Sequence, residues 1–359
     1  MPTVRVDFDA LSRIVGLEAP RNVSVRFFIV VDRPDSNQVD RVRELQRQSN
    51  VKVIVNPRNV GDHMSRNVGL EAGEGDFVLF LDDDITPDPD LFESYAEAIK
   101  SDSHAPGFVG VVRFPPTSNS FTRGVVSSDI LTFWDIAESR DSLAWGVTAN
   151  LMVRRSAAEG ITFSERFPKE GGGEDIDFCL RIVSKAGGWL KTVPKASVVH
   201  PWWNGGSRQY RRFARWAYGD CQLPTLHPKF KFRNAPNMVE TLALGLVIGG
   251  IFMATGIASV QLITIWCLGV MLLELVAETV RLKLRWGRIS ISTSLEAIVV
   301  RISNDLGRIA GHLKRGHLLG LTERFDYFMT GESKTYERKV AITKFGLYMA
   351  MTALFFSIH

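Results

Sequence analysis

Short apolar runs alternate with helically spaced segments along the first 220 residues. Runs of β-branched and aromatic residues at 25–32, 51–56 and 76–82 predict three strands. Residues 35–49 and 64–74 lie between these runs and have the spacing of amphipathic helices. Apolar strands separated by helices are typical of a mostly parallel sheet with helices on both faces. The pattern therefore predicts an α/β catalytic domain over residues 1–220.

The rest of the chain has a different pattern, dominated by long apolar runs. Residues 241–273 contain no charged side chain, and the small residues at 253–259 offer a break. We therefore expect two transmembrane helices over 238–280, because one helix of that length would be about 50 Å long in a hydrocarbon core of roughly 30 Å. A third apolar run predicts a transmembrane helix at 340–358, with Lys344 one turn inside it and able to reach towards the interface. A buried hairpin of a soluble protein is the alternative.

The positive charge of the chain gathers beside these apolar runs. The formal net charge is +4, and Arg and Lys are concentrated at 208–233, around the predicted linker 221–237, and again at 281–288. Bases that flank membrane segments mark the cytoplasmic side. We expect a multi-pass membrane protein whose catalytic domain faces the cytoplasm. The adjoining apolar runs make a membrane the better partner for these bases than nucleic acid.

The segment 281–339 is predicted to be cytoplasmic and to contain an amphipathic helix. Its apolar residues fall on one helical stripe: Leu295, Ile298, Val299, Ile302, Leu306, Ile309 and Leu313. Such a stripe is typical of a helix that lies on a membrane or packs under another domain. An ordinary surface helix is the alternative.

Three aspartates, Asp82–Asp84, follow the third predicted strand directly. Adjacent carboxylates repel one another, so each needs water or a cation. Ligands of parallel α/β sheets collect at the carboxyl ends of the strands, where Asp32 also lies. Oxygen ligands in such a crevice suit Mg²⁺ or Mn²⁺. A solvated loop with acids that cap the next helix is the alternative.

A second acidic group follows a run of three glycines in "GGGEDIDFCLRI", residues 171–182. Glycines let the backbone approach a ligand closely or move as a lid. A carboxylate at such a position, Asp175, can act as general base towards a hydroxyl. An acidic helix start is the alternative, but it does not require three glycines.

Six segments in order resemble the family 2 glycosyltransferases of the GT-A fold. They are "PT" (2–3), "IVVD" (29–32), "NVGDHMSRNVGL" (59–70), "FLDDD" (80–84), "GVTANLMVRRS" (146–156) and "GGGEDIDFCLR" (171–181). The resemblance covers roughly residues 1–220. It implies an inverting transfer of a sugar from a nucleotide-sugar donor to a hydroxyl acceptor, with Mg²⁺ or Mn²⁺ as cofactor. A lipid-linked or cell-surface glycan acceptor fits a membrane-anchored enzyme.

The resemblance also implies roles for single residues. The donor would be bound by Thr3, Asp32, Arg66, Asp82 and Asp83. The metal would be held by Asp84, Asp82 and His200, although a packed loop histidine is an equal alternative for the last. Asp175 would be the catalytic base and Glu174 would position it or the acceptor.

Residues 196–216 add candidates for contact with the acceptor or the membrane. Trp202 and Trp203 suit either stacking on a sugar face or a membrane interface. The segment "RFARW" is similar to the Q-x-x-R-W of processive family members, with Arg212 in place of the Gln. Arg212, Arg215 and Trp216 are predicted to meet either the phosphate of a lipid-linked acceptor or anionic headgroups.

Family members have an apolar strand just before the P-T, whereas Met1 stands directly before Pro2 here. We therefore expect the natural start to lie upstream. A missing first strand would expose the edges of two neighbouring strands. It also keeps a weakened, scaffold-like transferase open as an alternative function. A nucleotidyltransferase, which also uses metal-binding acids on an α/β sheet, is the other alternative.

Overall fold

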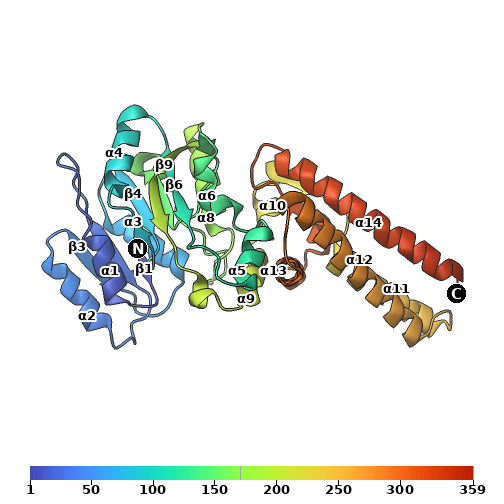
Figure 1. Ribbon diagram of the computed structural model, residues 1–359. Coiled ribbons are helices and arrows are strands. Elements are labelled where there is room, and N and C mark those ends of the chain that lie inside the picture. Colours follow the sequence, from blue (N-terminus) through green and yellow to red (C-terminus); the bar gives the residue numbers. More distant parts are fainter. Residues whose placement is uncertain (170, 359) are drawn as a thin grey trace. The chain divides into compact units, whose positions relative to one another are not determined.

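The computed structural model describes residues 1–169 and 171–358, and Figure 1 follows the chain through them. They form two compact units. The first contains residues 1–117 and 130–206, and the second contains residues 118–129 and those from 207 on. The acidic motifs lie in the first unit, and the long apolar helices lie in the second.

The first unit is an α/β unit. Its strands are β1 (Pro2–Thr3), β2 (Phe27–Val31), β3 (Val51–Val55), β4 (Phe77–Leu81), β5 (Thr86–Pro87), β6 (Gly107–Arg113), β7 (Ser142–Leu143), β8 (Asn150–Arg154) and β9 (Leu190–Val199). Its α-helices are α1 (Phe8–Val15), α2 (Val39–Arg43), α3 (Asp62–Ala72), α4 (Leu91–Ser101), α6 (Thr132–Asp135), α7 (Arg155–Ala158) and α8 (Glu174–Ala186). The three strands expected from the sequence correspond to β2, β3 and β4.

The strands form two sheets, and only one of them is parallel throughout. The order β1-β2-β3 is parallel. The larger sheet has the order β4-β8-β6-β9-β5, with β7 also paired to β9, and only its β6–β9 pairing is parallel. The prediction of a mostly parallel sheet was therefore wrong for the larger sheet. Strands β8 and β7 run antiparallel to their neighbours. The sequence of an apolar strand does not show whether its pairing is parallel or antiparallel.

Several strands end at candidate site residues. In the parallel sheet Thr3 of β1 is level with Val31 of β2, and the N–H of Asp32 donates to the carbonyl of Thr3. Asp82 follows β4 and His200 follows β9 directly. The carboxyl ends of these strands therefore carry the polar groups, as expected for ligand binding by an α/β unit.

An aromatic cluster joins α8 to β4. The ring of Phe178 on α8 stacks on Phe163 at 4.1 Å, and Phe80 of β4 meets both rings edge-on at 5.8 and 5.4 Å. All three side chains are buried. This packing fixes the helix whose first residues are Glu174 and Asp175 against the strand that ends at Asp82.

The second unit is mostly helical. Its α-helices are α5 (Ser120–Ser127), α9 (Tyr210–Asp220), α10 (Leu223–Leu226), α11 (Met238–Ala254), α12 (Val260–Trp286), α13 (Ile291–Lys314) and α14 (Glu332–Ile358). A short antiparallel pair joins β10 (Lys231–Arg233) to β11 (Glu323–Phe325). In Figure 1, α11 and α14 run alongside α12.

Among the described residues, one helix is long and apolar enough to cross a membrane, namely α12. The apolar helix α11 is shorter, and the chain turns between the two at residues 255–259. Lys344 of α14, which we expected to reach towards an interface, instead pairs with Glu274 and Glu278 of α12 at 2.8 and 2.6 Å. Three membrane spans therefore remain a prediction.

The buried face of α13 includes only part of the predicted apolar stripe. Ile298 of the stripe is buried, but Leu306 and Leu313 are 50% and 53% exposed. Close packing is made instead by small residues, since Gly307 packs against the backbone of Ala214 in α9. Small residues allow close helix contact, which a periodicity argument based on large side chains does not detect. The leucines of the stripe, here called the leucine stripe, therefore face outwards.

Candidate functional site

Each of the three aspartates after β4 has a different partner. Asp82 accepts a bond of 3.0 Å from the buried guanidinium of Arg66. Asp83 accepts from the hydroxyl of Thr3 at 2.6 Å and also pairs with Arg5. Asp84 pairs through Oδ2 with Arg5 at 2.8 Å. The repulsion among the three carboxylates is thus reduced by ion pairs with two guanidinium groups, those of Arg5 and Arg66.

Asp82, Asp84 and His200 form a group that fits a divalent cation. One ligand atom from each lies within 4.8 Å of the others. Nδ1 of His200 is 2.7 Å from the carbonyl of Pro201 and therefore carries the proton, which leaves the lone pair of Nε2 for a metal. Nε2 faces Asp84 Oδ1 at 3.4 Å and Asp82 Oδ2 at 3.9 Å.

A buried oxygen in this group has no hydrogen-bond partner. Asp84 Oδ1 accepts no bond from any residue that the structure describes. Burial raises the pKa of Asp84, the charges of Asp82 and Asp83 add to the rise, and the charge of Arg5 opposes it. An orphaned carboxylate oxygen facing an imidazole lone pair is the donor arrangement expected of a site for Mg²⁺ or Mn²⁺.

Asp32, predicted to contact the donor, is wholly buried and forms hydrogen bonds with the loop before α3. Its carboxylate accepts from Asn56 Nδ2 at 2.8 Å, from the N–H of Val60 at 2.9 Å and from the N–H of Gly61 at 2.8 Å. Gly61 has φ +96°, and a Cβ there would lie 2.9 Å from the backbone of Lys169. Asp32 thereby holds the turn that leads into α3.

The second acidic group begins α8. Gly171, Gly172 and Gly173 all have positive φ, at +86°, +114° and +85°, which other residues rarely adopt. Glu174 is buried and accepts from the N–H of Gly172 at 2.6 Å. Asp175 Oδ1 accepts from the N–H of Ile176 at 2.8 Å. Glu174 therefore shapes the glycine turn from which Asp175 projects.

Arg66 connects the two acidic groups electrostatically. Its side chain is 6% exposed. Burial lowers the pKa of Arg66, but the charges of Asp82, Asp62, Glu174 and Asp175 outweigh it and raise that pKa. The acids after β4 and those at the start of α8 therefore lie within range of one guanidinium.

Asp62, four residues before Arg66, is a site residue that the sequence reasoning missed. It is the first residue of α3 and is exposed. Desolvation by nearby protein atoms and the charges of Asp82 and Glu174 raise the pKa of Asp62 to about 6, against the effect of Arg66. The available signal was that Asp62 lies inside the quoted segment 59–70. An acid with a shifted pKa in such a place is a candidate for function.

Aromatic rings surround His200. Phe114, Trp134 and Trp203 have ring centroids 5.4, 5.3 and 5.4 Å from the imidazole. Trp202 stacks on Phe114 at 4.7 Å and donates from Nε1 to the carbonyl of Pro115 at 3.0 Å. The four large rings are half-buried. No pattern in the sequence indicated that Phe114 and Trp134, which are distant from His200 in the chain, would join this cluster.

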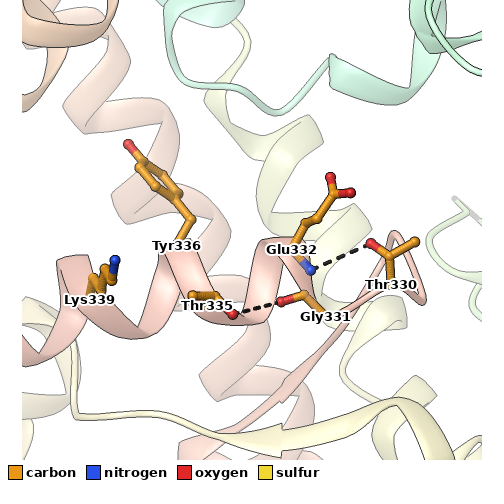
Figure 2. A pocket seen from close by; sticks show the side chains of 6 residues that line it. All are labelled: Thr330, Gly331, Glu332, Thr335, Tyr336 and Lys339. Atoms are coloured by element: carbon orange, nitrogen blue, oxygen red, sulfur yellow. Dashed lines mark hydrogen bonds between the residues drawn. The ribbon is translucent and has the colours of Figure 1, made fainter.

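The remaining predicted residues lie in the second unit. Arg212, Arg215 and Trp216 are on α9, and the Arg212 guanidinium is 6.0 Å from the centroid of the Trp216 ring. The second unit also has a cavity of about 570 Å³ at the start of α14. Figure 2 shows its lining, which is Thr330, Gly331, Glu332, Thr335, Tyr336 and Lys339. This cavity contains none of the candidate catalytic or metal-binding residues.

Residues 24–161 match the family model described as glycosyl transferase family 2. The succinoglycan biosynthesis protein ExoM of Rhizobium meliloti (strain 1021) is 27% identical over 198 residues, 54% of this chain and 62% of that protein. The pre-mycofactocin glycosyltransferase of Mycobacterium tuberculosis (strain CDC 1551 / Oshkosh) is 28% identical over 183 residues, 48% of this chain and 37% of that protein. The chain thus aligns with less than two thirds of the length of either curated relative.

Among solved structures, S. aureus TarS 1–349 in complex with UDP is similar at a TM-score of 0.43 and 15% identity. The alignment covers 88% of this chain and 90% of that one.

Proposed function

Because the chain contains a glycosyl transferase family 2 domain of the GT-A type, we propose that it transfers a sugar from a nucleotide-sugar donor to a hydroxyl acceptor, with inversion at the anomeric carbon. The observation that carries the proposal is the arrangement around Arg66. This guanidinium pairs with Asp82 of the metal-binding group, which consists of Asp82, Asp84 and His200. The negative charge of Asp175 also acts on it and helps to raise its pKa. A donor site and a general base thereby border one buried cation.

The donor end of the site is built from Thr3, Asp32, Arg66, Asp82 and Asp83. Thr3 and Asp32 act through their buried hydrogen bonds, which hold Asp83 and the loop before α3. Asp82, Asp84 and His200 would hold Mg²⁺ or Mn²⁺. The ion supplies stabilisation of the negative charge that develops on the departing nucleoside diphosphate.

Asp175 is the general base of the proposed reaction. It takes the proton of the acceptor hydroxyl as that oxygen forms a bond to the anomeric carbon, while the bond from this carbon to the diphosphate oxygen breaks. One attack from the opposite face inverts the anomeric configuration. Glu174, bound to the N–H of Gly172, keeps Asp175 at the glycine turn.

The aromatic cluster at His200 fits the acceptor. Half-buried rings of Phe114, Trp134, Trp202 and Trp203 offer apolar faces beside the metal-binding group, and such faces suit the apolar face of a pyranose. Arg212, Arg215 and Trp216 on α9 are assigned to anionic headgroups or to the phosphate of a lipid-linked acceptor.

The membrane part of the proposal rests on the second unit. Helix α12 is long enough to span, and we propose that α11 and α14 join it. Lys283 and Arg285 in the last turn of α12, and Arg288 just after it, would mark the cytoplasmic side. The outward leucine stripe of α13 would lie in the interface plane of the same leaflet.

A panel of nucleotide sugars, assayed for released nucleoside diphosphate with membranes as acceptor source, tests the function. We expect turnover that stops on chelation and returns with Mn²⁺ or Mg²⁺. Asp84→Asn and Asp175→Asn should each lose it, whereas Asp90→Asn, at an exposed helix start, should not. If the wild type and the variants are folded but none of them shows turnover, the alternative of a scaffold-like transferase is favoured. Release of a sugar 1-phosphate in place of the nucleoside diphosphate would favour a nucleotidyltransferase.

A further inference from the structure

Arg5 is a cation placed beside the metal-binding group, and no motif pointed to it. It lies between β1 and α1, and its guanidinium pairs with Asp83 and with Oδ2 of Asp84. Half of its side chain, 51%, is exposed to solvent. Because Asp84 uses Oδ2 for Arg5, its other oxygen, the orphaned Oδ1, is left facing His200.

The backbone around Arg5 is held in an unusual conformation. Val6 has φ +55°, which is rare for a β-branched residue. Its N–H donates to Thr3 Oγ1 at 2.9 Å, and that hydroxyl in turn donates to Asp83. The turn is thus tied to one of the two carboxylates that Arg5 binds. A strained turn persists where surrounding contacts over-determine it.

The charges around Arg5 nearly cancel before any metal binds. Three carboxylates, Asp82, Asp83 and Asp84, face two guanidinium groups, Arg5 and Arg66. A divalent cation added to this group makes it net positive. A diphosphate bound with the cation offsets this positive charge. Each ligand therefore raises the affinity of the site for the other.

We propose that Arg5 couples the binding of the divalent cation to that of the diphosphate, an inference that rests on the proposed function. Its positive charge weakens cation binding to the free site. The same charge attracts a diphosphate, because its contacts with the aspartates leave N–H donors of a half-exposed guanidinium for phosphate oxygens. By linkage, the two ligands raise each other's affinity to the same extent.

The alternative is that Arg5 only neutralises and orients Asp83 and Asp84. The two roles predict opposite effects of removing the charge. If Arg5 only orients Asp84, its loss weakens cation binding. If Arg5 sets the charge balance, its loss tightens cation binding to the free site.

The test is Mn²⁺ binding to the full-length chain in detergent, followed by the electron paramagnetic resonance of free Mn²⁺. Titrations run with and without inorganic pyrophosphate, each against a protein-free reference that accounts for the Mn²⁺–pyrophosphate complex. Arg5→Met keeps the length of the stem and removes the charge, and Arg5→Lys keeps the charge. Arg33→Met removes an exposed arginine that forms an ion pair with Asp35, and it is the matched control.

We expect Arg5→Met to bind Mn²⁺ about tenfold more tightly than the wild type without pyrophosphate, the order that Coulomb's law gives for a unit charge near a divalent ion in a partly hydrated site. The gain in Mn²⁺ affinity on adding pyrophosphate should shrink by a similar factor. Arg5→Lys should stay close to the wild type and Arg33→Met should equal it. Arg5→Gln repeats the measurement if the Met variant melts early.

Unchanged or weaker Mn²⁺ binding in Arg5→Met, without pyrophosphate, would overturn the coupling role. A wild type that takes up no Mn²⁺ under either condition would overturn both this inference and the metal site. The expected Mn²⁺ behaviour without turnover of any nucleotide sugar would overturn the proposed function and leave the coupling role supported.

Discussion

Replacing Asp32 tests whether this buried carboxylate holds the loop before α3 or contacts the donor itself. Oδ1 of Asp32 accepts from Asn56 and from the N–H of Val60, and Oδ2 accepts from the N–H of Gly61. The loop that these bonds hold leads into the helix that carries Arg66. Loss of the bonds should therefore loosen the first unit even without a ligand.

The magnitude follows from how many bonds each variant keeps. In Asp32→Asn the amide oxygen can replace Oδ1 and keep two bonds, while the amide nitrogen faces the N–H of Gly61. A buried donor left unpaired costs about 1–3 kcal/mol. In a domain of 150–250 residues each kcal/mol shifts Tm by about 2–4 °C. We expect Asp32→Asn to lower Tm by about 2–12 °C, and Asp32→Ala, which loses all three bonds, to lower it further.

Thermal melting of the full chain in detergent, followed by tryptophan fluorescence, measures this shift beside donor turnover. Asp35→Asn removes a carboxylate that is 82% exposed and should melt like the wild type. If Asp32→Asn also melts like the wild type but loses turnover, the carboxylate contacts the donor directly and the loop-holding role is wrong.

Three further predictions concern other parts of the chain. His200→Ala should lower metal-stimulated turnover at least about a hundredfold and abolish Mn²⁺ uptake, since the imidazole is one of the three ligands that we propose; unaltered uptake would contradict this. Asp175→Asn should lower turnover by about 10²–10⁴-fold and keep Mn²⁺ binding; parallel loss of both would mean a structural role. Gly307→Ala should lower Tm, because its Cβ would lie 1.9 Å from the Ala214 carbonyl oxygen, whereas Gly346→Ala, with no described atom within 4 Å, should not.

The sequence predicted well what is local. Each apolar run that ends in aspartate became a strand with the acid at its carboxyl end, as at Asp32 and Asp82. The glycine run before Glu174 became a turn of positive φ and the start of α8. These features depend on neighbours in the chain, so composition and spacing suffice to predict them.

What the sequence did not predict depends on distant partners. The antiparallel strand β8 pairs with β4 across some 70 positions of the chain, and its residues are as apolar as those of a parallel strand. Arg5 meets its aspartates nearly 80 residues on. Lys344 finds Glu274 and Glu278 on another helix rather than an interface. A charged residue in an apolar helix shows that a partner is needed but not where it lies.

The three adjacent carboxylates face positive charges of two kinds, fixed and exchangeable. Arg5 and Arg66 are part of the chain, so they stabilise the aspartates at all times but cannot follow a substrate in and out. The position bordered by Asp82, Asp84 and the lone pair of His200 is different, because the cation that we propose there would be exchangeable. In the proposed reaction, only this third charge would enter with a diphosphate and depart with it. On this proposal the two guanidinium groups hold the acids in place between turnovers, and they bring the free site close enough to neutrality that the exchangeable ion would leave with the product.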